Sequence, residues 1–507
     1  MSFPSFRALS IGLIMTSAAA GHAQSRERQA TNIARAVDSL TAVAVRDGIT
    51  PAIGVAVVMD GRTIYMEGHG MADATAGIPA DDRTLWYLAS TSKSLTGFGV
   101  SLLAQRGVLR FYAPIRTTVP NARWHAEAHS DQLTLARFLS HTHSLNDNAV
   151  VMSAAFTGAI PENRWPELTA LVGPSGNNDL VYSNFGYNVA AMAIDAARPE
   201  GWKKFLEDQV YRPAGMRETY ARVSGFDARR IAMPHRLTPE GRYVTAPFHK
   251  RDATMNSAGG HVATLGDLTR WTIVQMDSGR IDGQQVFPKA AVELSHRQIA
   301  PQTRDQAKRF AFFDREGWGA GWDIGKYEGE RMVSRFGSYS STRSHLGFLP
   351  GRRIGVVAMS TGGLGSSLTD VIAAYAYDLE AGKPEAQSRA TERMNDLRTR
   401  LASARRTAAT NDSTRQARQR QTLQRPLADF AGRYSDPAYG EITLTLRDGR
   451  LHYSWGVLAG DVEIFDAGKN QLVIDFSAGT TPLTFTFGSR GPASALSLQG
   501  ITFSRIP

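Results

Sequence analysis

The chain has 507 residues, 42% of them hydrophobic and 21% charged, a globular composition long enough for one large domain with a smaller partner. It contains no cysteine, which excludes disulfides, thiolate metal sites and a cysteine nucleophile. Its net charge of +10 comes mainly from residues 381–425, where a solvated helix face explains it, and we expect no nucleic-acid partner.

The N-terminal residues 1–23 have the layout of a secretory signal peptide. Arg7 precedes an apolar run at residues 8–20, and Gly21 and Ala23 place small residues before a cut ahead of Gln24. A membrane anchor is the alternative, but the run falls short of the ~20 apolar residues of a spanning helix. We therefore expect an exported protein, periplasmic or secreted, without an integral membrane segment in the mature chain.

Residues 26–380 combine strand and helix patterns. A buried strand is predicted at residues 53–59, with a turn at Gly61 and Arg62 and an antiparallel partner at residues 63–67. Further strands are expected at residues 332–336, 343–349 and 354–359, and helices at residues 95–106, 188–197, 202–210 and 265–276. This order predicts an α+β domain whose first and last strands meet in one antiparallel sheet flanked by helices.

The connector at residues 381–425 contains eleven basic and four acidic residues. Met394, Leu397 and Leu401 form a narrow apolar stripe, which predicts an amphipathic helix at residues 385–404 lying on a neighbouring surface. Residues 407–424 are polar, without apolar spacing or aromatic residues, and predict a linker.

The pattern changes again in residues 426–507. Ile442, Leu444 and Leu446 alternate with polar residues, and a turn at Asp448 and Gly449 leads into a second alternating stretch at residues 451–455. Similar alternation follows at residues 472–476 and 483–487. A small all-β domain, either a barrel or a sandwich, is predicted here.

Ser90 and Lys93 are the first candidate catalytic pair. They are three residues apart, so both side chains project from one face if Ser90 begins the helix. Burial and the positive potential of a helix N-terminus would disfavour the ammonium, which lets Lys93 accept the Ser90 proton. A Ser-x-x-Lys match alone is weak, and a capping serine with a solvent-exposed lysine is the alternative.

Tyr182 and Asn184 add a second pair of polar groups. A tyrosine beside a serine and a lysine can pass a proton to the leaving group, and an asparagine can orient Lys93 and donate to a substrate carbonyl. The alternatives are an interface aromatic for Tyr182 and a helix N-cap for Asn184. The combination with Ser90 and Lys93 makes the catalytic interpretation the stronger one.

These stretches resemble the serine β-lactamase and penicillin-binding-protein superfamily, specifically its class C β-lactamase-like branch with the related esterases and D-amino-acid peptidases. Ser90 to Lys93 looks like the nucleophile motif, and Tyr182 to Asn184 looks like the Tyr-x-Asn motif. Matching stretches also occur at residues 139–142, 213–216 and 257–260, in the order of the family. The resemblance covers residues 53 to about 379 and implies a serine hydrolase that needs no cofactor and no metal.

The third motif departs from the family, which has Lys-Thr-Gly or His-x-Gly where this chain has Arg335, Phe336, Gly337 and Ser338. Gly337 is kept, so a substrate backbone can approach that strand closely. By resemblance, the backbone N–H groups of Ser90 and Ser338 would form the oxyanion hole. Arg335 could bind a substrate carboxylate with two hydrogen bonds, and Tyr339 predicts a narrower pocket than usual.

Two further features bear on the site. His141 and His143 could suggest a metal, but no third ligand has a recognisable spacing, and satisfied loop histidines are favoured. The stretch at residues 426–442 is similar to the lipocalin-like β domains appended to some of these hydrolases. That resemblance implies an accessory module that shapes the cleft.

The expected function is two-step acyl transfer on Ser90, with Lys93 and Tyr182 moving the proton. The partner would be a small-molecule or peptide substrate, such as a D-amino-acid peptide, a small ester or a β-lactam. The altered third motif favours a peptidase or esterase over a β-lactamase. The alternative is a non-catalytic penicillin-binding-like sensor, for which Arg335 and Tyr339 are the support. The sequence carries no signal for an oligomeric state.

Overall fold

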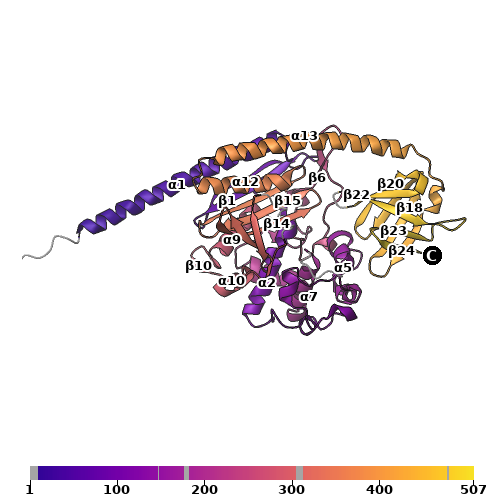
Figure 1. The fold of residues 1–507 in the computed structure, drawn as a ribbon, viewed down its shortest axis with the longest axis horizontal. Helices are drawn as coiled ribbons and strands as arrows, with labels where there is room; N and C mark the ends of the chain where they lie inside the picture. The colour runs from indigo at the N-terminus through magenta and orange to yellow at the C-terminus, as the bar shows by residue number, and fades with distance from the viewer. Residues whose placement is uncertain (1–8, 147, 176–181, 304–311, 477–478) are drawn as a thin grey trace, which may run out of the picture.

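The computed structural model describes residues 9–507 except 147, 176–181, 304–311 and 477–478 (Figure 1). Residues 1–8 of the predicted signal peptide, Arg7 among them, therefore lie outside the described residues, as do the two residues before Tyr182. Residues 9–23 form the start of helix α1 (Leu9–Arg46). Within the described ranges, no helix has both the length and the apolar character that crossing a bilayer requires.

A sheet of nine strands, counted over the described residues, is the centre of the larger domain. Its order is β11-β12-β13-β14-β15-β16-β1-β2-β3, and β1 (Ala52–Met59) pairs antiparallel with β16 (Ile354–Thr361). The predicted α+β class and the meeting of the first and last strands are thereby confirmed. The other strands are β2 (Arg62–Asp73), β3 (Ile78–Pro79), β11 (Ala300–Pro301), β12 (Asp314–Trp318), β13 (Asp323–Tyr327), β14 (Glu330–Tyr339) and β15 (Thr342–Leu349).

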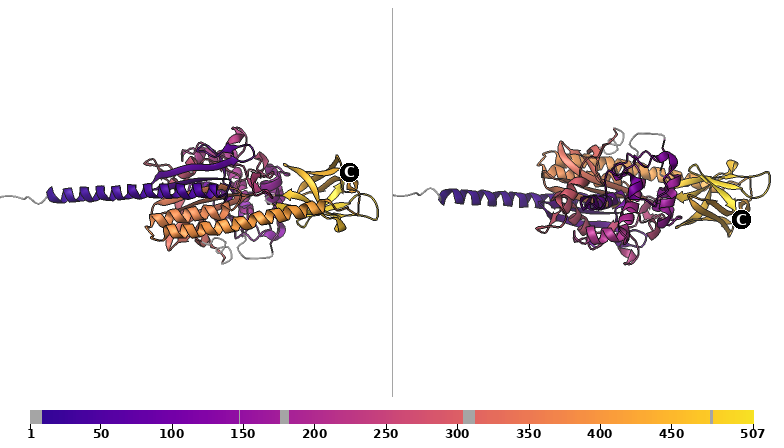
Figure 2. Two further views of the ribbon diagram at one scale, coloured as in Figure 1. Left: turned by 90° about the horizontal axis from the view of Figure 1, so that it is seen from above. Right: turned by 90° about the horizontal axis from the view of Figure 1, so that it is seen from below.

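Helices cover both faces of this sheet (Figures 1 and 2). On one face lie α1 and α12 (Gly365–Glu380), and on the other lie α2 (Ser92–Gln105), α9 (Leu265–Met276) and α10 (Lys289–Ser295). Strand β1 is buried at every position because alternate residues enter opposite cores. Val55 and Val57 pack with α1 and α12, whereas Ala56 and Val58 pack with α2 and α9.

The region between α2 and α9 contains the helices predicted at residues 188–197 and 202–210. It contains α7 (Phe185–Ala197) and α8 (Gly201–Leu206), and a π-helical turn, Glu207–Tyr211, continues α8. The shorter helices are α3 (Ile115–Thr118), α4 (Leu135–Leu139), α5 (Asn148–Met152) and α6 (Trp165–Leu168). Gly107 follows α2 with φ at +71°, a left-handed conformation that glycine adopts readily and that ends the helix where the sequence predicts.

The connector is one helix, α13 (Ala386–Gln419), so the predicted linker at residues 407–424 is wrong up to Gln419. The predicted amphipathic part is confirmed, because Met394, Leu397 and Leu401 are buried against α1 and α12. The second part of α13 has no apolar stripe, and polar contacts keep it against the C-terminal domain instead. Arg415 pairs with Glu463 of the C-terminal domain, and the Gln419 side chain bonds the backbone of the neighbouring residue, Ile464.

The C-terminal domain is a closed barrel of eight strands, counted within the described part of the chain. Of the two predicted architectures, the barrel is therefore the correct one. Its strands are β17 (Gly432–Asp436), β18 (Gly440–Arg447), β19 (Arg450–Trp455), β20 (Leu458–Asp466), β21 (Gln471–Phe476), β22 (Gly479–Thr486), β23 (Ala495–Leu498) and β24 (Ile501–Ile506). Trp455, Leu483 and Phe503 are buried in its core. The same apolar cluster takes in Met152 and Phe248 of the larger domain, which joins the two domains.

Candidate active site

Ser90 lies on a short 3-10 turn, Ala89–Thr91, between strand β4 (Trp86–Tyr87) and helix α2. Ala89 has φ at +47°, a left-handed conformation that is strained for a residue with a Cβ. Gly337 of β14 packs directly against this turn. A Cβ on Gly337 would lie 2.2 Å from the carbonyl oxygen of Leu88 and 2.8 Å from the Ser90 nitrogen, so only glycine fits. The close approach at Gly337 is thus to the nucleophile turn itself.

Lys93 is fully buried, one turn along from Ser90. Its Nζ lies 3.2 Å from Ser90 Oγ and donates to Asn184 Oδ1 at 2.6 Å and to the Ala258 carbonyl at 2.8 Å. Burial lowers the pKa of Lys93 to about 8, and the charge of Arg335 adds to that effect. In the neutral amine the two N–H donors go to Asn184 and Ala258, which leaves the lone pair for the Ser90 proton. This geometry differs from that of a solvent-exposed lysine.

Tyr182 donates from its hydroxyl to Ser90 Oγ at 2.8 Å. Burial raises the pKa of the phenol, but the positive charges of Arg335 and Lys93 outweigh burial and bring it to about 8. The ring packs against His141 and Trp318, with centroids 4.6 Å and 5.7 Å away. Tyr182 is therefore held by aromatic contacts at its ring and by charges at its hydroxyl.

Asn184 immediately precedes α7, yet its side chain does not cap that helix. Its Oδ1 accepts from Lys93 instead. The structure thus brings four of the predicted residues, Ser90, Lys93, Tyr182 and Asn184, into one hydrogen-bonded group.

Arg335 is only 2% exposed and makes three contacts within the protein. Its Nε donates to the Ser90 carbonyl at 3.1 Å, Nη2 donates to the Tyr182 hydroxyl at 2.7 Å, and Nη1 lies 3.4 Å from Asp323 Oδ2. Each of its three nitrogens has a protein partner, and the predicted clamp on a substrate carboxylate stays a prediction. The guanidinium faces the phenol, where it stabilises the phenolate.

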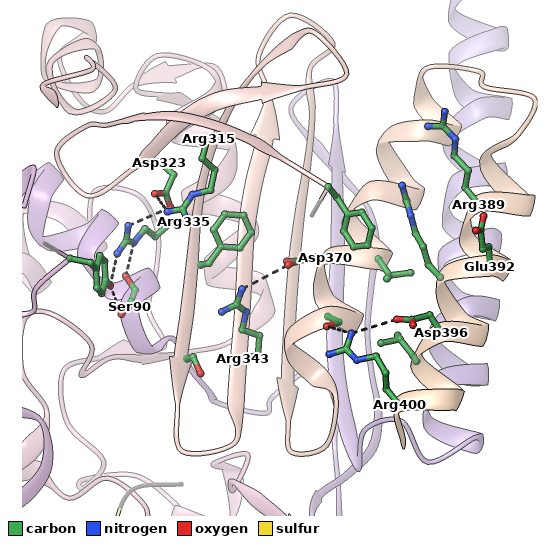
Figure 3. Close-up of a pocket in the computed structure, with 18 of the residues that line it drawn as sticks. Ser90, Arg315, Asp323, Arg335, Arg343, Asp370, Arg389, Glu392, Asp396 and Arg400 are labelled. Carbon is green, nitrogen blue, oxygen red and sulfur yellow. Dashed lines mark hydrogen bonds and ion pairs between the residues drawn. The ribbon is translucent and has the colours of Figure 1, made fainter. Parts of the chain in front are cut away.

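Asp323 and Arg315 are site residues that sequence reasoning missed. Asp323 is 1% exposed on β13 and pairs with both Arg335 and Arg315, which lies on β12. Figure 3 shows Arg315 and Arg335 at the one carboxylate of Asp323. This shared contact fixes the direction in which Arg335 reaches the Tyr182 hydroxyl. No local spacing marks these residues, because the contact depends on the pairing of neighbouring strands. The one signal in the sequence was an aspartate, Asp323, within a stretch that forms a buried strand.

Ser338 follows Gly337 on the part of β14 that extends past its partner β13, where pairing ends at Ser334. That free edge faces the Ser90 turn, and Ser338 lines two cavities together with Ser90. The oxyanion role of the Ser90 and Ser338 N–H groups remains a prediction.

The larger cavity, of about 1070 Å³, begins at Ser90 and Tyr182 and reaches past Arg343 and Asp370 to residues of α13 (Figure 3). The smaller, of about 200 Å³, lies beside Ser90 and Asn184 and contains no part of Tyr182 in its lining. Tyr339 stands at the smaller cavity and stacks on Phe248, with ring centroids 5.5 Å apart, and on Phe156 at 6.2 Å. The ring of Tyr339 therefore forms part of the wall of the smaller cavity.

His141 and His143 are buried loop residues. Nδ1 of His141 accepts from the Ser183 N–H, and Nδ1 of His143 accepts from the Leu145 N–H, each at 3.2 Å. The His141 ring also supports Tyr182. Among the residues that the structure describes, no group of three or more histidine, aspartate or glutamate side chains could hold a metal ion.

The curated proteins that this chain resembles include a penicillin-binding protein and a protein named flp. "Penicillin-binding protein 4" of Amycolatopsis lactamdurans is 23% identical over 62% of this chain and 82% of its own length. "Protein flp" of Staphylococcus aureus is 20% identical over 64% of this chain. This alignment spans 62% of the Staphylococcus protein, less than two thirds of its length.

Solved structures share the fold over much of the chain. The octameric penicillin-binding protein homologue from Pyrococcus abyssi superposes with a TM-score of 0.57 at 16% identity, covering 92% of this chain and 98% of that one. The D-amino acid amidase from Ochrobactrum anthropi SV3, complexed with L-phenylalanine, gives 0.56 at 19% identity, covering 72% and 99%. Residues 33–378, which hold every site residue above, match the family described as Beta-lactamase. The chain belongs to the Beta-lactamase family.

Proposed function

We propose that this protein is a serine hydrolase that cleaves amide or ester bonds through an acyl-enzyme on Ser90. The observation that carries the proposal is the pair of contacts at Ser90 Oγ, with Lys93 Nζ at 3.2 Å and the Tyr182 hydroxyl at 2.8 Å. Both groups have pKa values of about 8, close to the pH at which proton transfer in either direction is efficient. Family membership supports the same chemistry.

In the acylation step, Ser90 Oγ attacks the substrate carbonyl carbon while its proton passes to Lys93 Nζ or to the phenolate of Tyr182. The carbonyl oxygen becomes an oxyanion, for which the backbone N–H groups of Ser90 and Ser338 are the proposed donors. As the carbon–nitrogen or carbon–oxygen bond breaks, that proton reaches the leaving group through the hydroxyl of Tyr182, which receives it from Ser90 directly or from Lys93. In deacylation a water molecule attacks the ester, the same bases take its proton, and Ser90 regains its hydrogen.

Arg335 lowers the pKa of Tyr182 and so enables it to take part in proton transfer. An ordinary phenol would be protonated throughout the neutral range, whereas the guanidinium beside Tyr182 lets it exchange a proton near pH 8. Because Arg335 is occupied in this way, carboxylate recognition by the third motif is weakened. This supports a peptidase, amidase or esterase, acting on D-amino-acid peptides or small esters, ahead of a β-lactamase.

We also propose that the protein acts outside the cytoplasm, after removal of residues 1–23. Support comes from the apolar run and the small residues at Gly21 and Ala23. The buried side chains Ala30, Ile33 and Val37 of α1 all follow the proposed cut, so the mature chain would keep this contact with the sheet. Mass analysis of the protein from a secreting host should give a chain that begins at Gln24.

The catalytic proposal is tested by incubating the protein with a fluorophosphonate probe and with p-nitrophenyl acetate. We expect one adduct, mapped to Ser90 by mass spectrometry, and saturable ester hydrolysis that the Ser90→Ala variant lacks. Absence of an adduct on folded protein would contradict the proposal and favour a non-catalytic sensor. Rapid, saturable turnover of a chromogenic cephalosporin would reverse the ranking of peptidase or esterase over β-lactamase.

A further inference from the structure

Lys250 is a second buried lysine near Ser90, and the mechanism above does not use it. Its side chain is 2% exposed and lines the smaller cavity together with Ser90 and Asn184. Nζ donates to the Ala155 carbonyl at 2.6 Å and to the Thr254 carbonyl at 3.1 Å, and it lies 3.9 Å above the centre of the Tyr339 ring.

The positive charge of the Lys250 ammonium is only partly compensated by its protein partners. Two carbonyl oxygens occupy two of the three N–H donors of an ammonium, and a ring face compensates charge less well than a carboxylate does. Within the described residues, Nζ of Lys250 forms no ion pair with a carboxylate. The carboxylate of Asp252, two residues along the chain, accepts from the N–H of Val223 and the hydroxyl of Ser224 instead. Burial and the charge of Lys93 accordingly lower the pKa of Lys250 well below its ordinary value. Buried cations in proteins are normally paired.

The position of Tyr182 tells which part of a substrate each cavity receives. Tyr182 returns the proton to the leaving group, so the leaving group lies on the side of the larger cavity, which Tyr182 lines. The smaller cavity also begins at Ser90, but its lining contains Asn184 and not Tyr182, so we assign the acyl group to it. With about 200 Å³ and a wall formed by Phe156 and Tyr339, it accommodates a short acyl chain only.

We propose that the smaller cavity binds a short acyl group ending in a carboxylate, which forms an ion pair with Lys250. The inference rests on the proposed acyl-enzyme at Ser90 and names the substrate class of that site. It assigns the acyl part to a dicarboxylic acid linked through one carboxyl group as an ester or amide. The free carboxylate supplies the charge that the protein itself does not place beside Lys250.

The test compares p-nitrophenyl hydrogen glutarate with p-nitrophenyl pentanoate, two acyl chains of equal length with and without the carboxylate. Rates are corrected with the Ser90→Ala protein, which measures spontaneous hydrolysis of each ester. We expect kcat/KM to favour the glutarate by about tenfold or more, the size of a charge-assisted hydrogen bond. Lys250→Met, which keeps the length of the side chain, should abolish the preference while p-nitrophenyl acetate hydrolysis stays within about threefold of wild type.

Arg251→Met is the matched control, because Arg251 is the adjacent cation and its side chain is exposed. It should leave the glutarate preference unchanged. A measurement on the wild type alone guards against a Lys250→Met protein that does not fold: free glutarate should inhibit acetate ester hydrolysis more strongly than pentanoate does. Equal rates for the two esters, or a preference that survives Lys250→Met, would overturn the inference and leave the proposed function intact. Absence of both acetate hydrolysis and Ser90 labelling would overturn the proposed function and this inference together.

Discussion

Nη2 of Arg335 lies 2.7 Å from the hydroxyl of Tyr182, and the same hydroxyl lies 2.8 Å from Ser90 Oγ. The permanent positive charge of Arg335 is therefore linked to the nucleophile, Ser90 Oγ, through the Tyr182 hydroxyl. The third motif of the family, Lys-Thr-Gly or His-x-Gly, places a lysine or a histidine at this strand position. Either of these side chains can lose its proton. Arg335 stays charged across the working pH range, so its effect on Tyr182 is constant.

Replacing Arg335 with glutamine should move the pH dependence of hydrolysis. The pKa of Tyr182 is about 8 because Arg335 and Lys93 outweigh burial, so loss of the guanidinium raises that pKa and shifts the lower limb of the profile to higher pH. At pH 7 we expect kcat/KM to fall about 100-fold, within the usual range for proton-transfer groups. Arg335→Lys retains a charge and should keep the limb near its wild-type position. A profile unchanged in Arg335→Gln would refute this role.

Lys93 should make the protein more stable as the pH rises above 8. Burial lowers its pKa to about 8 in the folded protein, against 10.5 for an ordinary lysine. Between these values the unfolded chain binds a proton that the folded chain has released, so the free energy of unfolding increases with pH, by at most about 1.4 kcal/mol per unit. Urea unfolding at pH 8, 9 and 10 should show this slope, reduced in Lys93→Met. The exposed Lys289→Met variant should retain the full slope; equal slopes in all three proteins would exclude the effect.

Gly337→Ala should damage the site through the backbone. The new Cβ would overlap the Leu88 carbonyl, and relief requires β14 or the Ser90 turn to shift. Overpacking of this kind costs about 1–3 kcal/mol, so the melting temperature should fall by several degrees and labelling of Ser90 by the probe should slow markedly. Gly479→Ala is the matched control, since a Cβ on Gly479 of β22 meets nothing within 4 Å. Labelling at the wild-type rate in Gly337→Ala would show that the turn tolerates the added atom.

Asp323→Ala should destabilise the larger domain. It would leave Arg315 and Arg335 buried without their shared carboxylate, and removing one partner of a buried ion pair costs about 3–5 kcal/mol. Thermal unfolding should therefore occur about 10 °C lower, and ester hydrolysis should fall because Arg335 loses its orientation. Glu316→Ala removes an exposed partner of Lys326 from the same edge of the sheet and should not change the melting temperature measurably. Equal melting temperatures for the two variants would show that Asp323 does not stabilise the larger domain through Arg315 and Arg335.

What the sequence predicts well is local. Ser90 and Lys93 share one helical turn, and Asn184 is two residues from Tyr182, so short spacings already place each pair together. Strand β1 is found because a run of apolar residues marks a strand buried on both faces. The contact of Asp323 with Arg335 has no such signature, since it depends on the register of β13 against β14. The end of α13 was missed for a related reason: polar contacts to β20 hold it in place of an apolar stripe.

Because α13 is helical to Gln419, it sets the orientation of the barrel as well as its distance from the sheet. A helix of 34 residues is about 50 Å long, and each added residue turns whatever follows it by about 100°. Inserting two residues would swing the barrel to the far side of the helix axis, whereas seven residues, two turns, would nearly restore its direction. The Val457 N–H and the Thr157 carbonyl lie 2.7 Å apart at the domain junction. This contact depends on the rotation about the axis of α13, a helix that begins at Ala386, 46 residues before the first barrel strand begins at Gly432.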